Sequence, residues 1–181
     1  MKILVAYGTT EGQTRKISEF VSRQLAGNEV QLYDSAQATP VPKVEDADVV
    51  VIAASVHLKV HQDSIANFVV AHLDQLRSKP SLFLSVSLSA AFDEGKADAK
   101  AYADQFVADT GWQPNRSVLL GGALRYSEYD YFQEQIIQHL VLKGREITVA
   151  TGDYEFTDWD DLSRQITDFM RTVAGLNWRP T

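Results

Sequence analysis

Short apolar runs alternate with amphipathic segments along this chain. Four runs, at residues 3–7, 49–54, 82–86 and 118–120, are rich in Val, Ile and Leu and show no alternation with polar residues. Runs of this kind are typical of parallel strands that are covered on both faces. A fifth run, at residues 30–34, does alternate, as a less covered edge strand does.

Between these runs, apolar residues recur at helical spacing. We expect helices around residues 17–25, 65–76, 99–106 and 159–173, with Thr157 as the cap of the last one. Alternating strands and helices with right-handed crossovers predict an α/β fold, a doubly wound sheet of five parallel strands in the order 2-1-3-4-5 with helices on both faces.

The length and composition bound the class of protein. A chain of 181 residues, 45% of them hydrophobic, can bury one full core, so we expect a single domain over residues 1–181. The net charge of −7 argues against binding to nucleic acid or to an anionic membrane surface, so membrane contact is expected to be peripheral at most. The first strand begins within two residues of the start and no apolar run is long enough to span a membrane, so a cytoplasmic location is expected.

Cysteine is absent, which excludes disulfides, thiolate catalysis and cysteine-ligated iron–sulfur clusters. The four histidines are scattered and no metal site is expected. Redox chemistry would therefore require a bound cofactor.

The segment after the first strand has the composition of an anion-binding loop. Gly8 and Gly12 allow close backbone approach, and hydroxyl side chains lie between and after them. The helix that follows carries unpaired N–H groups and about half a positive charge at its start. The residues expected to bind a phosphate are Thr9, Thr10, Glu11, Gly12, Gln13 and Thr14. An ordinary strand-to-helix turn with a Thr cap remains the alternative.

This loop matches neither of the two common nucleotide patterns. No Lys-Ser/Thr pair follows a second glycine, and the glycine spacing is not G-x-G-x-x-G. In a sheet of the expected order, a ligand binds beyond the carboxyl ends of the strands, at the switch point between the first and third strands. The loops at residues 55–61 and 87–92 should meet the phosphate loop there.

Several motifs carry a resemblance to a known family over the whole chain. They are Thr9-x-x-Gly12-x-Thr14, Glu11-Gly-Gln-Thr14, Ala54-Ser55 before a loop that ends in His61, Trp112-x-Pro114, Gly122-Ala-Leu-Arg-Tyr126 and Thr-Asp-Trp159. With these motifs the chain resembles the flavodoxin-like proteins and, among them, the menaquinone-dependent protoporphyrinogen IX dehydrogenase family. The resemblance implies FMN as cofactor and electron transfer as the chemistry.

The resemblance also implies where FMN would lie. Residues 9–14 would hold its phosphate, and two further loops would flank its ring system. The ring-flanking residues expected from these loops are Ser55, Val56, His57, Leu58, Lys59, Ser87, Leu88 and Ser89.

The chain departs from that family in two places. The family typically has an aromatic residue followed by Gly where Leu58-Lys59 stands. A residue other than Gly resists positive φ by about 1–2 kcal/mol, so we expect this backbone to avoid that conformation, which favours two-electron chemistry. The family's basic region after Arg125 is mostly acidic here.

Candidate catalytic residues are few. His57 and His61 could exchange a proton near neutral pH, Lys59 would bring a cation to the crevice, and Arg125 could pair with a substrate carboxylate. Arg125 and Lys59 could equally be solvated surface residues, and loop histidines without a visible partner are more often bystanders. Residues 124–156 could build a substrate pocket beside the cofactor.

Two functions remain open. The first is an FMN-dependent oxidoreductase that passes electrons from an organic substrate, such as a porphyrinogen, to a quinone-type acceptor. The second is a flavodoxin-type electron carrier that serves redox proteins, or a flavoprotein similar to NAD(P)H-quinone reductases without porphyrin activity; an acidic surface suits such a carrier. A receiver-like module is disfavoured because Ala6-Tyr7 offers no acidic magnesium pocket.

Overall fold

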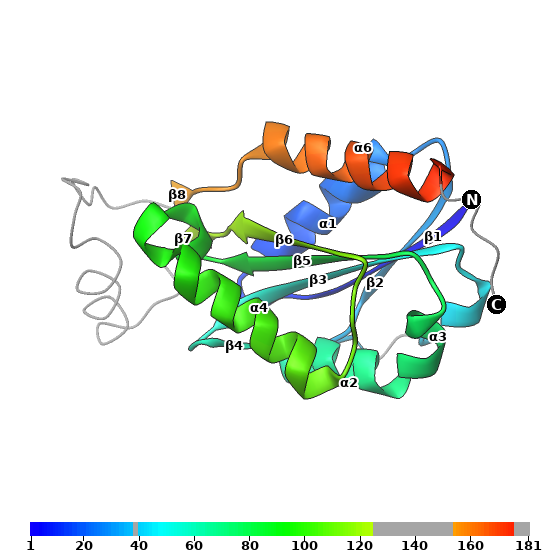
Figure 1. Ribbon diagram of the computed structural model, residues 1–181, viewed down its shortest axis with the longest axis horizontal. Helices are drawn as coiled ribbons and strands as arrows, with labels where there is room; N and C mark the ends of the chain where they lie inside the picture. The colour runs from blue at the N-terminus through cyan, green and yellow to red at the C-terminus, as the bar shows by residue number, and fades with distance from the viewer. Residues whose placement is uncertain (38–39, 125–153, 176–181) are drawn as a thin grey trace.

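The computed structural model describes residues 1–37, 40–124 and 154–175 (Figure 1). The strands are β1 (Lys2–Gly8), β2 (Glu29–Asp34), β3 (Val49–His57), β4 (Val60–His61), β5 (Ser81–Ser87), β6 (Arg116–Gly121), β7 (Ala123–Leu124) and β8 (Tyr154–Glu155). The α-helices are α1 (Gln13–Gln24), α2 (Asp63–Ala71), α3 (Leu73–Arg77), α4 (Lys96–Thr110) and α6 (Trp159–Gly175), and short 3-10 turns are η1 (Val44–Asp46), η2 (Ser89–Ala91) and η3 (Asp93–Gly95).

Five parallel strands form the sheet in the order β2-β1-β3-β5-β6. Counted along the chain as the five parallel strands, this is the expected order 2-1-3-4-5, and β2 lies at an edge as expected. Two short antiparallel pairings are additional: β4 folds back on β3, and β7 pairs with β8. In the part of the chain that is described, no helix is both long and apolar enough to cross a membrane.

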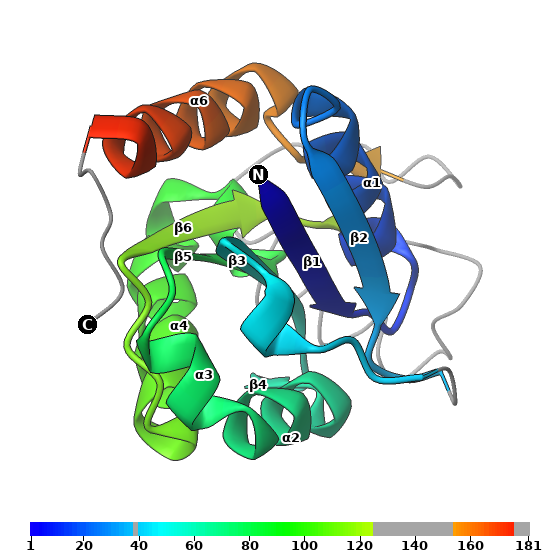
Figure 2. The same cartoon turned by 90° about the vertical axis from the view of Figure 1, so that its right-hand side faces the viewer.

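Helices cover both faces of the sheet (Figures 1 and 2). Alternate residues of β1 point to opposite sides: Ile3, Val5 and Tyr7 belong to the core beneath α1 and α6, whereas Leu4 and Ala6 belong to the core against α2 and α4. Because both faces are buried, the strand has no polar face. This explains the unbroken apolar runs in the sequence.

The second expected helix, over residues 65–76, is wrong as a single element. The chain forms α2 and α3, separated at His72, whose backbone has φ −116° and ψ 21°. His72 Nδ1 lies 2.8 Å from the carbonyl oxygen of Phe68, within hydrogen-bonding distance of the last turn of α2. Apolar spacing continues across this break, so the periodicity alone did not reveal it.

The expected cap of α6 is also wrong. Asp158 Oδ1 accepts a hydrogen bond of 2.8 Å from the backbone N–H of Asp161, which makes Asp158 the cap. Thr157 is buried instead, and its hydroxyl donates to the carbonyl oxygen of Gly121 over 2.7 Å while accepting from Gln13 Nε2 over 2.9 Å. Thr157 therefore ties the end of β6 to the start of α1.

Candidate functional site

A crevice lies where the carboxyl ends of the parallel strands meet, and three loops distant in sequence form its walls. Its cavity volume is about 60 Å³, and it is partly open to solvent. Its lining residues are Thr9, Thr10, Glu11, Gln13, Thr14, Ser55, Val56, His57, Val86, Ser87, Leu88, Gly122 and Ala123. The convergence expected from the strand order is therefore present.

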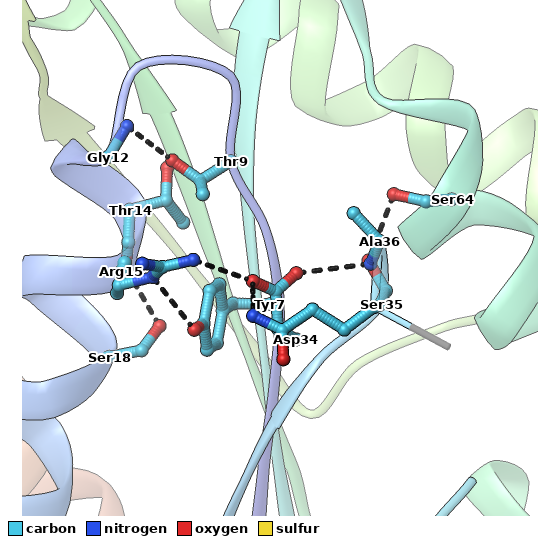
Figure 3. Close-up of polar contacts among 11 residues, drawn as sticks. Tyr7, Thr9, Gly12, Thr14, Arg15, Ser18, Asp34, Ser35, Ala36 and Ser64 are labelled. Atoms are coloured by element: carbon cyan, nitrogen blue, oxygen red, sulfur yellow. Dashed lines mark hydrogen bonds and ion pairs between the residues drawn. The ribbon is translucent and has the colours of Figure 1, made fainter. Parts of the chain in front are cut away.

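The first wall is the loop from β1 into α1. Gly12 precedes the helix with φ 87°, a conformation that suits glycine, and its N–H donates to Thr9 Oγ1 over 2.9 Å. Figure 3 shows Thr9, Gly12 and Thr14 together at this turn. The backbone N–H groups of the first helical turn face this loop without intrahelical partners, as at any helix start.

Two buried side-chain atoms at this helix start have no hydrogen-bond partner among the described residues. They are Thr14 Oγ1 and Gln13 Oε1, and Thr14 is fully buried. An unpaired buried polar atom costs about 1–3 kcal/mol, so such atoms in a native protein point to a missing partner. A ligand anion at the start of α1 would accept the hydroxyl proton of Thr14 and the free N–H groups together.

The cations beside this loop are engaged elsewhere. Arg15 lies between Tyr7 and Asp34: its Nε donates to Tyr7 Oη over 3.2 Å, and its Nη2 forms a 2.9 Å ion pair with Asp34 (Figure 3). Lys16 pairs with Glu155. Burial, as the largest influence, raises the pKa of Tyr7 and so keeps its hydroxyl neutral. An anion in the crevice would therefore meet neutral donors and not these charges.

The second wall is the end of β3 and the hairpin that it forms with β4. Leu58 and Lys59 make the two-residue turn, with φ values of 49° and 71°. The expectation that this backbone avoids positive φ is thus wrong, because pairing of β3 with β4 imposes a tight turn on both residues. Ser55, Val56 and His57 line the crevice, whereas Leu58 and Lys59 lie at the exposed tip of the hairpin, outside the lining residues.

The two histidines proposed for proton exchange have different environments. His57 Nδ1 lies 3.9 Å from Glu11 Oε1, across the crevice between the first and second walls. His61 is buried, packs on Phe83 and Phe106, and its Nε2 lies 3.0 Å from Ser85 Oγ, within hydrogen-bonding distance. Burial lowers the pKa of His61 to about 4, so its ring is neutral at pH 7 and belongs to the core.

The third wall combines the end of β5 with the segment after β6. Ser87 and Leu88 line the crevice as expected, whereas Ser89 begins η2 and is not among the lining residues. Gly122 donates its N–H to the carbonyl oxygen of Ser87 over 3.0 Å, which brings Gly122 and Ala123 to the crevice. The site residues expected from the sequence did not include Gly122, Ala123 or Val86. Two small residues directly after β6 were the signal that could have identified Gly122 and Ala123.

Some candidates lie outside the described residues. These are Arg125 and the segment 125–153, which contains most of the proposed pocket at residues 124–156. Among the residues that are described, His, Cys, Asp and Glu form no cluster that could hold a metal ion.

The arrangement fits FMN on its own chemistry. A phosphate needs several hydrogen-bond donors, and the wall at α1 offers hydroxyl and N–H groups, including the buried hydroxyl of Thr14 that no described residue pairs with. The flat remainder of the cofactor would lie between the second and third walls, whose lining side chains are small or apolar except for His57.

Comparison with known proteins agrees with this geometry. Residues 4–148 match the model of the flavodoxin domain. The chain belongs to the flavodoxin family. It is 32% identical over 184 residues to the protein named protoporphyrinogen IX dehydrogenase [quinone] from Escherichia coli (strain K12). The match covers 100% of this chain and 99% of that protein. The chain is therefore a member of that group of oxidoreductases within the family.

Two solved structures share the fold. Oxidised flavodoxin 1 from Bacillus cereus superposes with a TM-score of 0.57 at 11% identity, over 94% of this chain and 98% of that chain. A flavoprotein from Lactobacillus acidophilus NCFM in complex with FMN has a TM-score of 0.51 at 13% identity, over 65% of this chain and 92% of that chain. At these identities the likeness establishes the doubly wound architecture of the family and nothing further.

Proposed function

We propose that this protein binds FMN in the crevice and uses it to oxidise an organic substrate. The observation that carries the proposal is the fully buried hydroxyl of Thr14 at the start of α1, which has no partner among the residues that the structure describes. FMN supplies the redox centre that a chain without cysteine needs for such chemistry. The chain's own residues would bind it and orient it.

The proposed binding set divides between phosphate and ring. Residues 9–14 would hold the phosphate, and residues 55–57 with Ser87 and Leu88 would flank the ring system. Leu58, Lys59 and Ser89, which lie beyond the crevice lining, would contact the outer edge of the ring or a substrate that approaches it. His57 is the proposed proton-exchanging group, because it alone among the lining residues carries an imidazole.

The full-length similarity supports a proposal for the substrate and the acceptor. The Escherichia coli relative is named for protoporphyrinogen IX and for a quinone, so we propose a porphyrinogen as electron donor and a quinone as acceptor. We also propose that the protein acts in the cytoplasm, with at most peripheral membrane contact. Lys59, exposed at the hairpin tip, and Arg125 would offer positive charge to the carboxylates of a porphyrinogen.

An electron carrier is the second candidate. The excess of 24 acidic over 17 basic residues favours it, since an acidic surface can steer a protein towards basic redox partners. An enzyme should turn over a small-molecule substrate unaided, whereas a carrier needs a partner protein on each side.

Cofactor binding is tested by titrating the purified protein with FMN and following flavin fluorescence. Riboflavin, which lacks the phosphate, is the matched ligand control. We expect FMN to bind more tightly than riboflavin by at least about tenfold, because the phosphate contributes several charge-assisted hydrogen bonds. Equal affinity for both ligands would show that the phosphate of FMN does not bind at the start of α1.

Turnover is then tested with the protein loaded with FMN, a porphyrinogen and a soluble quinone, under anaerobic conditions. We expect oxidation of the porphyrinogen to depend on both the protein and the quinone. Absence of turnover, together with rapid electron exchange with a redox protein, would favour the carrier.

A further inference from the structure

Gln62 joins two walls of the crevice through its side-chain amide. It lies between β4 and α2, and its Nε2 donates to Thr10 Oγ1 over 2.7 Å and also to Ser55 Oγ. Thr10 belongs to the loop after β1 and Ser55 to the end of β3, and both line the crevice. A single amide group therefore contacts a hydroxyl of each wall.

The contact decides the direction in which these hydroxyl groups point their protons. An amide nitrogen can only donate, so it occupies a lone pair of each oxygen. The proton of each hydroxyl must then point away from Gln62 and is free to be donated to a ligand in the crevice. Thr9 is held in the same way by the N–H of Gly12, which donates to its Oγ1 over 2.9 Å.

The opposite orientation of the amide is less favourable here. Gln62 Oε1 is buried without a partner among the described residues, near Gly8. If the two ends were exchanged, an NH₂ group with two donors would be buried there without an acceptor, and orphaned buried N–H groups are rarer than orphaned oxygens. The observed orientation leaves only one oxygen unpaired.

We propose that Gln62 is a positioning residue that fixes Thr10 and Ser55 as hydrogen-bond donors to the ligand. The described lining of the crevice contains no Lys or Arg, so these donors would let it bind an anionic ligand. The inference rests on the proposed FMN function and deepens it: Thr10 would donate to the phosphate, and Ser55 to an acceptor elsewhere on the same ligand. The Glu11 carboxylate in the same loop makes such donors more necessary, since it opposes an anion.

The decisive variant is Gln62→Glu. It keeps the shape of the side chain but replaces the donor by a carboxylate, which accepts the protons of both hydroxyls and reverses their direction. We expect FMN affinity to fall by about 30-fold to 100-fold, and that of Gln62→Met, which removes the contact without reversing it, by about threefold to tenfold. Gln31→Glu on the exposed edge strand β2 is the matched charge control and should bind FMN as the wild type does.

A Thr10→Val background separates reversal of the hydroxyl from simple repulsion by the new charge. If Gln62 acts through Thr10, Gln62→Glu should cost at least about fivefold less in FMN affinity when Thr10 is already Val. The same loss in both backgrounds, or equal losses for Gln62→Glu and Gln62→Met, would overturn the proposal. Riboflavin affinity should change less than FMN affinity, and an equal change for both would also count against it.

A measurement without ligand keeps this inference separate from the proposed function. A wild-type protein that binds no FMN refutes the FMN proposal, and Gln62 is then judged by nuclear magnetic resonance alone. We expect nuclear Overhauser contacts from the side-chain NH₂ of Gln62 to the side chains of Thr10 and Ser55. Contacts from that NH₂ to the α-protons of Gly8 in their place would show the reverse orientation and overturn the proposal.

Discussion

Lys59→Gly should stabilise the protein, although glycine usually destabilises. Leu58 and Lys59 form the turn between β3 and β4 with φ of 49° and 71°, and His57 pairs with Val60 on either side of them. Positive φ at two successive residues indicates a type I′ turn, whose second position strongly prefers glycine. An L side chain in this region costs about 1–2 kcal/mol, which Lys59→Gly would relieve.

The gain is reduced by the greater freedom of glycine in the unfolded chain, which costs about 0.4–1 kcal/mol. Lys59 is exposed, so little packing is lost with its side chain. The net expectation is an increase of about 0.5–1 kcal/mol in the free energy of unfolding, or about 1–4 °C in Tm for a chain of this size.

Urea denaturation followed by tryptophan fluorescence, without added ligand, measures this change. The matched control is Lys43→Gly, at an exposed lysine whose φ is −77°, where glycine relieves no strain. Lys43→Gly should lower the free energy of unfolding by about 0.4–1 kcal/mol. If Lys59→Gly destabilised the protein as much as Lys43→Gly does, the turn would not hold the strain inferred from its backbone angles.

Three other changes test the site and its surroundings. Thr14→Val should weaken the binding of FMN by about 1–2 kcal/mol in a fluorescence titration, because a hydrogen bond to a charged group is lost. Unchanged affinity would show that the phosphate binds elsewhere. His61→Gln should reduce the loss of stability between pH 8 and pH 5 by about 2 kcal/mol, measured by urea denaturation at each pH. Asp34→Ala should lower the free energy of unfolding by about 1–2 kcal/mol, since it removes the hydrogen bonds that the buried carboxylate accepts from Arg15 and from the backbone N–H of Ala36; a change below about 0.5 kcal/mol would show that these contacts are replaceable.

The sign for His61 follows from its lowered pKa. Folding holds the pKa of His61 at about 4, below its ordinary value of 6.5, so the unfolded chain binds its proton more readily. The neutral ring therefore imposes no penalty above pH 6.5, and stability is lost as the pH falls from 6.5 towards 4. A wild-type protein with the same acid sensitivity as His61→Gln would show that His61 is not the group responsible.

The strand order could be predicted because short stretches of the chain encode it, and the glycine and threonine turn at the start of α1 could be located from the same kind of local signal. Apolar runs that lack a polar face require cover on both sides of a sheet, and this with the intervening helices leaves few topologies. The Gly12 turn and the hydroxyls of Thr9 and Thr14 act within one loop, so their local spacing was enough to identify them.

Other features depended on segments that meet only after folding. Gln62 reaches Thr10 from 52 residues away, and Gln13 reaches Thr157 from 144 residues away. The sequence suggested that His61 is a loop residue, because the local sequence pattern does not reveal that β4 places its ring against Phe83 and Phe106. Leu58-Lys59 carries no turn signal, and pairing of β3 with β4 imposes positive φ on it.

The physical reason for this division is the range of each interaction. Hydrophobic periodicity and helix-start chemistry act over a few residues, so the sequence by itself determined the sheet, its two covered faces and the position of the loop between β1 and α1. The direction of a hydroxyl proton or the neutrality of a buried imidazole depends on atoms from several strands at once. Only the tertiary structure brings those atoms together, and it therefore decided the contacts of Gln62 with Thr10 and Ser55 and the burial of His61.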